Sequence, residues 1–256
     1  MSLTGPRTLI TAGAAGIGRR MVDHFADAGA QIVVCDVDEA ALAQLAAERP
    51  EVTSVKADIA DEADVERLFE AVTDTLGGLD NLIANAGISG PAQPVEDITL
   101  DDWRRTMAVN IDGMFLCVRA GVPLLKQAGG GSIITLSSAA GKFAYPLRTP
   151  YSASKWAVVG FTKTLAAELG AHAIRANSLL PGVVEGARID RVIHDKANAR
   201  GVPAEDMRAQ YEGFASLKTM IPGDDIAAMA LYLCSEAGQR ISGQAISIDG
   251  DIQSLA

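Results

Sequence analysis

The chain has 256 residues, of which 48% are hydrophobic, 21% charged and 5% aromatic, and its formal net charge is −10. This length is common for a single α/β domain. The negative charge argues against nucleic acid and anionic membranes as partners. Three widely spaced cysteines without a CxxC motif argue against a disulfide framework or a zinc site. We find no signal-peptide pattern and no apolar stretch of the roughly 20 residues that a membrane span needs, so we expect a cytoplasmic protein.

Short apolar runs alternate with amphipathic ones along almost the whole chain. The runs typical of strands are residues 8–11, 32–36, 53–56, 81–84, 132–137, 175–179 and 245–248. Helix-like stretches lie between them, for example residues 16–28 and 61–76. The strand-like runs are continuously apolar, which is typical of a parallel sheet with helices on both faces. We therefore expect an α/β fold, a doubly wound parallel sheet of the Rossmann type with about seven strands.

The organisation of the chain predicts one domain, residues 1–256, because no linker or repeat divides it. One segment, residues 183–221, interrupts the alternation with polar, weakly amphipathic sequence where a short connection would suffice. Long insertions in compact domains are usually lids or binding loops. We expect this segment to form a substrate lid.

A glycine-rich loop follows the first strand-like run and opens the first helix-like stretch. Gly13, Gly16 and Gly18 would let the backbone turn tightly and approach a pyrophosphate at the helix N-terminus, although an ordinary tight turn has the same pattern. Asp36 ends the second strand-like run, where a carboxylate can bind a ribose diol and repel a 2′-phosphate. Its alternative role is a helix N-cap, a position that Asp38 can fill. The pattern predicts a dinucleotide site that favours NAD over NADP.

Tyr151 and Lys155 have the i, i+4 spacing of one helix face, in a helix-like run that follows Pro150. A free tyrosine, with a pKa of about 10, is a poor base, but a neighbouring ammonium and a helix N-terminus favour the phenolate. Such a tyrosine can take a proton from an alcohol while hydride leaves to a nicotinamide, or return one to a ketone. The alternative is a solvent-exposed pair. Ser138 ends the fifth strand-like run, at the sheet edge where α/β folds bind ligands.

In the order of its motifs the chain resembles the short-chain dehydrogenase/reductase family over residues 7–250. The motifs that carry the resemblance are the loop of residues 11–18, Asp58, Asn85-Ala86-Gly87, Asn110-Ile111-Asp112-Gly113, Ser138, Tyr151 with Lys155, Pro181-Gly182, and Ser242-Gly243-Gln244 with Ile248-Asp249-Gly250.

The resemblance implies a catalytic set of four residues. Tyr151 would be the acid/base, Ser138 would bind the substrate oxygen, Lys155 would hold the nicotinamide ribose, and Asn110 would position a water that relays the proton. Asn110 has a second reading, in which it only caps or kinks its helix. Ser137 is interpreted as a strand-end hydroxyl and not as the catalyst.

The resemblance also implies a cofactor site. Asp58 would contact the adenine, Asn85 would support the sheet edge, and Ile17 and Val184 would contribute backbone groups near the nicotinamide. The residues expected to bind the cofactor are Gly13, Gly16, Ile17, Gly18, Asp36, Asp58, Ile59, Asn85, Ala86, Gly87, Tyr151, Lys155, Pro181, Gly182 and Val184.

The chain departs from the family pattern at four positions. Ala12 replaces the first glycine of the loop, which costs on the order of 1 kcal/mol if φ is positive. Ala84 replaces an asparagine, and Gly186 replaces a threonine that would bond the nicotinamide amide, which puts that contact in doubt. Asp251 replaces the second glycine of the C-terminal motif, with no role assigned to it.

Several basic residues lie near the expected site or in the lid. Arg148, or the lid residue Arg188, could anchor an anionic substrate, but the equal numbers of basic and acidic residues in the lid are equally typical of a solvated surface. Arg191, His194 and Arg208 are further lid candidates, and no histidine spacing suggests a metal site.

Three functions fit the sequence. The first is an NAD-dependent oxidoreductase that interconverts a secondary alcohol and a ketone of a small polar metabolite. The second is an NADPH-dependent 3-oxoacyl carrier-protein reductase. The third is a non-catalytic NAD-sensing or scaffold protein, against which the complete catalytic set argues. The resemblance also implies a homotetramer.

Overall fold

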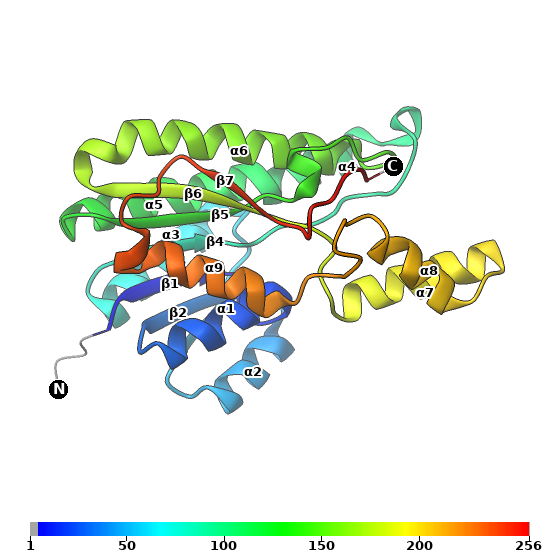
Figure 1. Ribbon diagram of the computed structural model, residues 1–256. Helices are drawn as coiled ribbons and strands as arrows, with labels where there is room; N and C mark the ends of the chain where they lie inside the picture. The colour runs from blue at the N-terminus through cyan, green and yellow to red at the C-terminus, as the bar shows by residue number, and fades with distance from the viewer. Residues whose placement is uncertain (1–4, 256) are drawn as a thin grey trace.

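Seven parallel strands form one sheet in the order β3-β2-β1-β4-β5-β6-β7 (Figure 1). The structure is a computed structural model that describes residues 5–255, apart from the side chains at positions 188, 195, 196 and 199. The strands are β1 (Arg7–Thr11), β2 (Gln31–Asp36), β3 (Thr53–Lys56), β4 (Asn81–Ala84), β5 (Gly131–Leu136), β6 (Ile174–Pro181) and β7 (Ala245–Ile248). The expected fold class is confirmed. The strand order reverses between β1 and β4, which is where such sheets bind ligands at their carboxyl ends.

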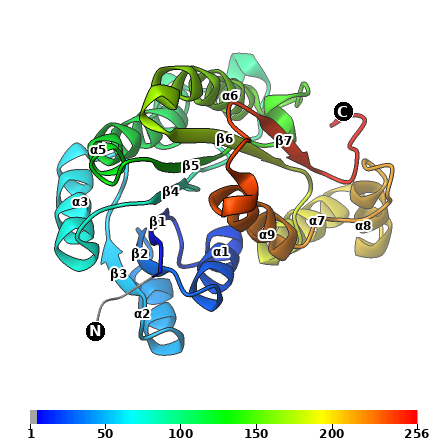
Figure 2. The same cartoon turned by 60° about the vertical axis from the view of Figure 1, so that its left-hand side comes forward.

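Helices cover both faces of the sheet (Figure 2). They are α1 (Gly16–Asp27), α2 (Glu39–Glu48), α3 (Glu62–Leu76), α4 (Leu100–Met107), α5 (Gly113–Gln127), α6 (Thr149–Leu169), α7 (Ala187–Arg200), α8 (Ala204–Glu212) and α9 (Gly223–Cys234). Successive strand residues point to opposite faces. In β1, accordingly, Leu9 packs into the core under α3, α5 and α6, and Ile10 into the core under α1, α2 and α9. This two-sided burial explains why the strands are continuously apolar.

Helices α4 and α5 form one helical run, Leu100–Gln127, through a π turn at Ala108–Asp112. By length and composition this run could cross a membrane, so the expectation that no such stretch exists was wrong. In the fold, 44% of its most apolar window is buried. Met114, Cys117 and Leu125 pack into the core on the α3 side of the sheet. The buried part of this apolar run thus faces the core, and the rest lies at the surface.

The interruption at residues 183–221 contains α7 and α8, which lie beyond the carboxyl ends of the strands (Figure 1). They share a small core of Ile193, Ala197, Met207, Tyr211 and Met220. Val184 and Ile221 form a parallel bridge, so the segment leaves and rejoins the fold at one place. The insertion at residues 183–221 was predicted, but its two helices were not. Each helix buries only a few apolar residues, which gives a weak helical pattern in the sequence.

The C-terminal residues brace the end of this segment. Ala215 and Ile252 form an antiparallel bridge. The hydroxyl of Ser216 donates to Oδ2 of Asp251 at 2.7 Å, and Asp251 adopts a φ of +61°. The departure at Asp251 thus keeps the left-handed backbone that suits glycine and adds a contact to the helical segment.

Candidate active site

The glycine loop between β1 and α1 packs so closely against neighbouring atoms of the protein that side chains would not fit at two of its positions. Gly16 has a φ of +55°, a Cβ on Gly13 would lie 2.8 Å from Cγ1 of Val34, and a Cβ on Gly18 would overlap the carbonyl oxygen of Ala12. The N-cap residue of α1 is Ala15, which has no side-chain group that could cap the helix and so leaves the first amides available to an anion. Ala12 has a φ of +50°. The methyl group at this departure therefore costs about 1 kcal/mol.

The end of β2 carries a carboxylate beside this loop. Oδ2 of Asp36 accepts from the amide of Ala14 at 3.2 Å, and Oδ1 accepts from the amide of Asp38 at 3.2 Å. The N-cap of α2 is Asp38, which accepts from Ala40 and Ala41 at 3.0 Å each. Asp36 is therefore not the helix cap, and its carboxylate lies at the predicted place.

The ends of β1 and β4 are joined by Asn85. Its Nδ2 donates to the carbonyl oxygens of Thr11 at 3.0 Å and Ala12 at 2.9 Å. Oγ1 of Thr11 accepts from the amides of Asn85 at 3.0 Å and Ala86 at 3.1 Å. The predicted support of the sheet edge by Asn85 is present. Ala84 is buried in the core on the α3 side of the sheet, where no hydrogen-bonding group is needed.

Asp58 follows β3 at the same edge. Its Oδ1 accepts from the amide of Ala60 at 3.0 Å, and its Oδ2 accepts from Nη2 of Arg105 at 3.1 Å. Arg105 comes from α4, 47 positions along the chain, and nothing in the sequence indicated this pair. The neighbouring Ile59 is buried against Gly113 of α5, so its side chain belongs to the core.

Tyr151 and Lys155 lie in the first turns of α6. Nζ of Lys155 is 5.6 Å from the centroid of the Tyr151 ring and donates to the carbonyl oxygen of Leu136 at 2.7 Å. Lys155 is only 4% exposed. The alternative of a solvent-exposed pair is therefore wrong for the lysine.

Asn110 lies fully buried in the π turn between α4 and α5. Its Oδ1 accepts from the amide of Ile88 at 2.8 Å, and its Nδ2 donates to the carbonyl oxygen of Ile88 at 2.9 Å and to Oγ of Ser154 at 2.9 Å. Ser154 in turn donates to the carbonyl oxygen of Tyr151 at 2.7 Å. Turns of this kind are frequent at functional sites. Asn110 thus lies at a helix irregularity and also connects it to α6.

Gly87 is where Asn110 and Lys155 converge. A Cβ at this position would lie 3.2 Å from Oδ1 of Asn110 and 3.2 Å from Nζ of Lys155. Only a residue without a side chain leaves this space open. Two polar groups from separate helices therefore meet beside the strand end that carries Asn85 and Ala86.

Ser138 follows β5 and is half-buried, and its Oγ accepts from the amide of Ala140 at 3.1 Å. The neighbouring Ser137 is buried and donates to the carbonyl oxygen of Lys155 at 2.7 Å. Ser137 is therefore a strand-end hydroxyl, as predicted. Ser138 is the serine at this strand end whose hydroxyl is partly accessible.

The remaining predicted cofactor residues lie around the same edge. Pro181 ends β6, and a Cβ on Gly182 would lie 2.8 Å from Cα of Asp249. Val184 begins the bridged segment and Ile17 lies in the first turn of α1. Gly186 has a φ of +134°, a backbone conformation that a threonine would rarely adopt, so this departure reflects a different local backbone.

Two of the arginines considered as anion anchors have contacts within the protein. Nη1 of Arg148 donates to the carbonyl oxygen of Gly90 at 3.1 Å. Arg208 pairs with Asp190 and contacts Sδ of Met220. The side chain of Arg188 lies outside the described residues. No group of three or more His, Cys, Asp or Glu side chains in the described part of the chain is placed to hold a metal ion.

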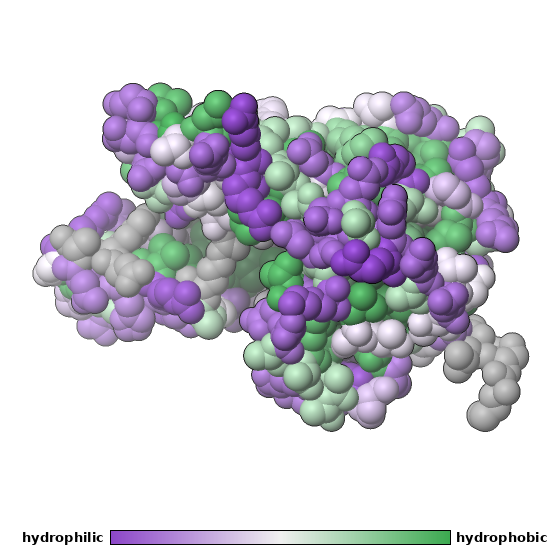
Figure 3. All heavy atoms as spheres, turned by 180° about the vertical axis from the view of Figure 1, so that it is seen from behind, coloured by the Kyte–Doolittle hydropathy of each residue, from purple (hydrophilic) through white to green (hydrophobic). Residues whose placement is uncertain are grey.

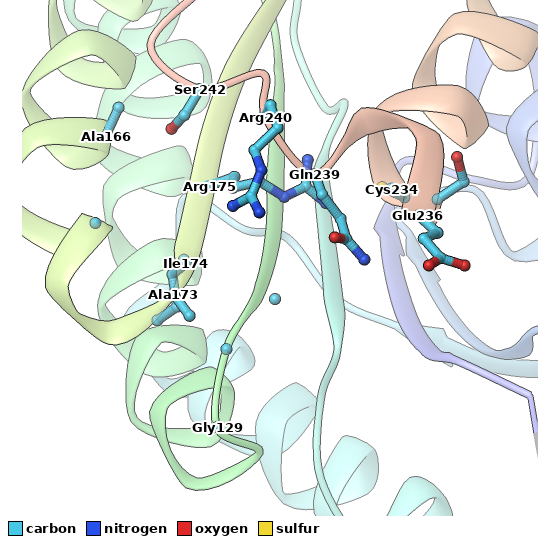
Figure 4. Close-up of a pocket in the computed structure, with 14 residues that line it drawn as sticks. Gly129, Ala166, Ala173, Ile174, Arg175, Cys234, Glu236, Gln239, Arg240 and Ser242 are labelled. Carbon is cyan, nitrogen blue, oxygen red and sulfur yellow. The ribbon is translucent and has the colours of Figure 1, made fainter.

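A cavity of about 710 Å³ lies near the amino ends of β5 and β6, away from the predicted site residues (Figure 4). Nη1 of Arg175 donates there to the carbonyl oxygens of Leu233 and Gly238. Arg175 thereby binds carbonyls at the end of α9 and in the turn that follows. The cavity lies between the starts of β5 and β6, the end of α6 and the turn after α9, and none of the predicted site residues lines it.

Comparisons with known proteins identify relatives of this chain. A family model described as enoyl-(acyl carrier protein) reductase matches residues 12–251. The chain is 31% identical to 2,5-dichloro-2,5-cyclohexadiene-1,4-diol dehydrogenase of Sphingobium indicum, over 99% of both chains. It is 35% identical to D-threitol dehydrogenase of Mycolicibacterium smegmatis, over 97% of this chain and 93% of that one.

The fold is also similar to solved structures. The 3-ketoacyl-(acyl-carrier-protein) reductase from Brucella melitensis, complexed with NADH, superposes with a TM-score of 0.86 at 32% identity, over 97% of this chain and 98% of that one. The relatives of this chain include a diol dehydrogenase and a threitol dehydrogenase, and their lengths are similar to the length of this chain. The chain belongs to the short-chain dehydrogenase/reductase family.

Proposed function

We propose that the protein is an NAD-dependent oxidoreductase that interconverts a secondary alcohol and a ketone, with Tyr151 as the acid/base. The observation that carries the proposal is the convergence of Lys155 and Asn110 at Gly87, directly beside Tyr151. A buried ammonium next to a tyrosine ring stabilises the phenolate, and a binding module has no need of this arrangement.

Each of the four proposed catalytic residues has its own role in the transfer of the proton. Oη of Tyr151 takes the proton of the substrate hydroxyl, and Ser138 holds the substrate oxygen through its partly accessible hydroxyl. Lys155 stabilises the charge on Tyr151 from its fixed position on the carbonyl of Leu136. Asn110, held by Ile88 and Ser154, positions the water that passes the proton to solvent.

The described residues also fit a nicotinamide dinucleotide. The glycine loop offers a surface without side chains and the uncapped start of α1, and Asp36 offers a carboxylate for a ribose diol. When bound, the nicotinamide accepts the hydride of the alcohol or returns it to the ketone. Because a carboxylate repels a 2′-phosphate, we expect Asp36 to favour NAD over NADP.

The first test removes the Tyr151 hydroxyl. Tyr151→Phe should reduce turnover of a substrate alcohol below detection while NADH binding, measured by nicotinamide fluorescence, changes less than threefold. Tyr232→Phe, at an exposed position of α9, is the matched control and should remain active. Near-full activity of Tyr151→Phe would remove the tyrosine from the mechanism.

A second function is the reduction of a 3-oxoacyl carrier protein with NADPH. It is favoured by the similarity to the Brucella melitensis reductase, although that structure holds NADH. Titration with both reduced cofactors separates the two proposals. Tighter binding of NADPH than of NADH would contradict the argument from Asp36 and favour the second function.

We also propose that residues 1–256 act as one domain, with α7 and α8 as the substrate lid, in a cytoplasmic homotetramer. Trp103, Phe115 and Trp156 are exposed on α4, α5 and α6, which supports an apolar contact face between subunits. Light scattering after gel filtration measures the assembly, and a monomer at micromolar concentration would refute it.

A further inference from the structure

A second cavity, of about 360 Å³, lies between the loop before α6 and the helices α7 and α8. Its lining consists of Tyr145, Pro146, Leu147, Arg200, Met207, Gln210, Tyr211, Phe214 and Leu255. The first three residues belong to the segment that joins Ser138 to Tyr151. One wall of the cavity thus belongs to the chain segment that runs between the two proposed catalytic residues. The view from behind shows the molecule hollowed between the α7–α8 helices and the rest, with apolar residues in its depth (Figure 3).

The walls of this cavity are apolar and aromatic. Tyr211 and Phe214 pack edge to face, with ring centroids 5.5 Å apart. The two strongly polar members bind each other, since Nη1 of Arg200 donates to Oε1 of Gln210 at 3.2 Å. Most of the lining surface is apolar, so the several hydroxyls of an open-chain polyol would lose more hydrogen bonds to water than the few polar groups of the lining can replace, which is costly. A hydrocarbon ring would instead bury apolar surface there.

Leu147 is the wall residue that most clearly indicates a ligand. It is 53% exposed and has a φ of +65°, a conformation that L residues with large side chains rarely adopt. Two backbone hydrogen bonds hold this turn, from Gln93 to the carbonyl of Leu147 at 2.9 Å and from Arg148 to the carbonyl of Tyr145 at 3.2 Å. Strained backbone held in this way is typical of ligand-binding sites.

The opposite wall is braced as well. The amide of Gln253 donates to the carbonyl of Phe214 at 3.2 Å, which fixes the C-terminal residues against the end of α8. Leu255 closes this side of the cavity. The apolar space is therefore bounded by backbone contacts and does not depend on flexible side chains alone.

From this lining we infer that the substrate is a carbocyclic secondary alcohol or ketone of one or two rings, with its ring system against Leu147 and Phe214. The inference rests on the proposed function and names the substrate class of that same site. The polar part of such a molecule is its reacting end, which lies toward Ser138 and Tyr151. The reaction converts the ring carbinol into a ring ketone, with the proton passing to Tyr151 and the hydride to NAD.

The test compares three alcohols, two diols and one tetrol, with NAD at saturation. Trans-cyclohexane-1,2-diol and butane-2,3-diol are both vicinal secondary diols, and threitol is an open-chain polyol. We expect kcat/KM for the cyclic diol to exceed that for threitol at least tenfold, with butane-2,3-diol between them. Equal or faster oxidation of threitol would overturn the inference and leave the proposed function standing. Failure to oxidise any of the three, or other alcohols, with NAD or NADP would count against the proposed function itself.

A pair of variants tests the cavity directly. Leu147→Asn keeps a residue that tolerates positive φ and places an amide on the apolar wall. We expect it to raise KM for the cyclic diol about tenfold and to leave KM for NAD unchanged. Leu217→Asn is the control, because Leu217 is 71% exposed and lies outside the cavity lining. Equal loss for the cyclic diol and threitol in Leu147→Asn, or equal effects of both variants, would overturn the inference.

Discussion

Ala12→Gly tests whether the glycine loop stores backbone strain. Ala12 adopts a φ of +50° at the end of β1. Its carbonyl oxygen accepts a hydrogen bond from Asn85 at 2.9 Å and lies where a Cβ of Gly18 would be. The left-handed conformation is therefore imposed by the loop around it, and alanine adopts it at a cost of about 1–2 kcal/mol.

The expected increase in the free energy of unfolding is the strain energy that is released minus the free energy by which glycine favours the unfolded chain. Glycine in place of alanine favours the unfolded state by about 0.4–1 kcal/mol, which leaves a net stabilisation of about 0.5–1 kcal/mol. The unfolding entropy of a chain of 256 residues is about 0.5 kcal/mol per degree. The Tm should therefore rise by about 1–2 °C.

Differential scanning calorimetry is the assay, with two further variants for comparison. Ala173 has a φ of +56°, so Ala173→Gly should raise the Tm similarly and the double variant should rise by the sum. Ala128 has a φ of −72° at the end of α5, so Ala128→Gly should lower the Tm. If Ala12→Gly lowers the Tm as much as Ala128→Gly does, the strain argument is refuted.

Three further predictions concern the site, the sheet and the thiols. Gly87→Ala should lower kcat at least tenfold, because the added methyl group would displace Lys155 and Asn110. Gly160→Ala is the control and should leave kcat unchanged, because a Cβ at this position on α6 meets nothing within 4 Å. Equal kcat values for the two variants would contradict the claim that Lys155 and Asn110 meet at Gly87. Asp80→Asn should lower the free energy of unfolding by about 1 kcal/mol at neutral pH. Because the hydrogen bond from Arg7 holds the pKa of Asp80 below its usual 3.8, the difference from wild type in urea titrations should persist above about pH 4 and vanish as the pH falls through the folded pKa. Burial raises the pKa of the Cys117 thiol to about 12, so this thiol should react with a disulfide reagent at pH 8 only after unfolding, and rapid labelling of Cys117 in the native protein would be the opposite result.

Much of the fold could be predicted because each strand is buried on both faces. Every expected strand is present, and the bounds of six of the seven differ by one residue at most, because the apolar run and the strand end together at the carboxyl edge. The helices α7 and α8 were missed because most of their surface is polar, and their few buried positions, such as Ile193 and Met207, give a weak pattern.

The site was predictable where one motif carries both partners. Tyr151 and Lys155 are four residues apart on one helix, so their proximity follows from helix geometry. The contacts of Asn110 were not predictable, because its π turn depends on packing against α6 and on the loop at Ile88. The pair of Asp58 with Arg105 joins distant segments of the chain, which no local pattern reports.

The brace between the chain end and α8 has a practical consequence for protein engineering. Ile252 bridges Ala215, and Leu255 lines the apolar cavity, while the N-terminal part of the chain enters β1 from the amino ends of the strands (Figure 1). An affinity tag or fluorescent fusion at the C-terminus would therefore emerge beside the proposed substrate cavity and alter kinetics without any mutation. The first described residue, Gly5, precedes β1 at the amino ends of the strands, so rates and assembly are best measured with fusions at the N-terminus.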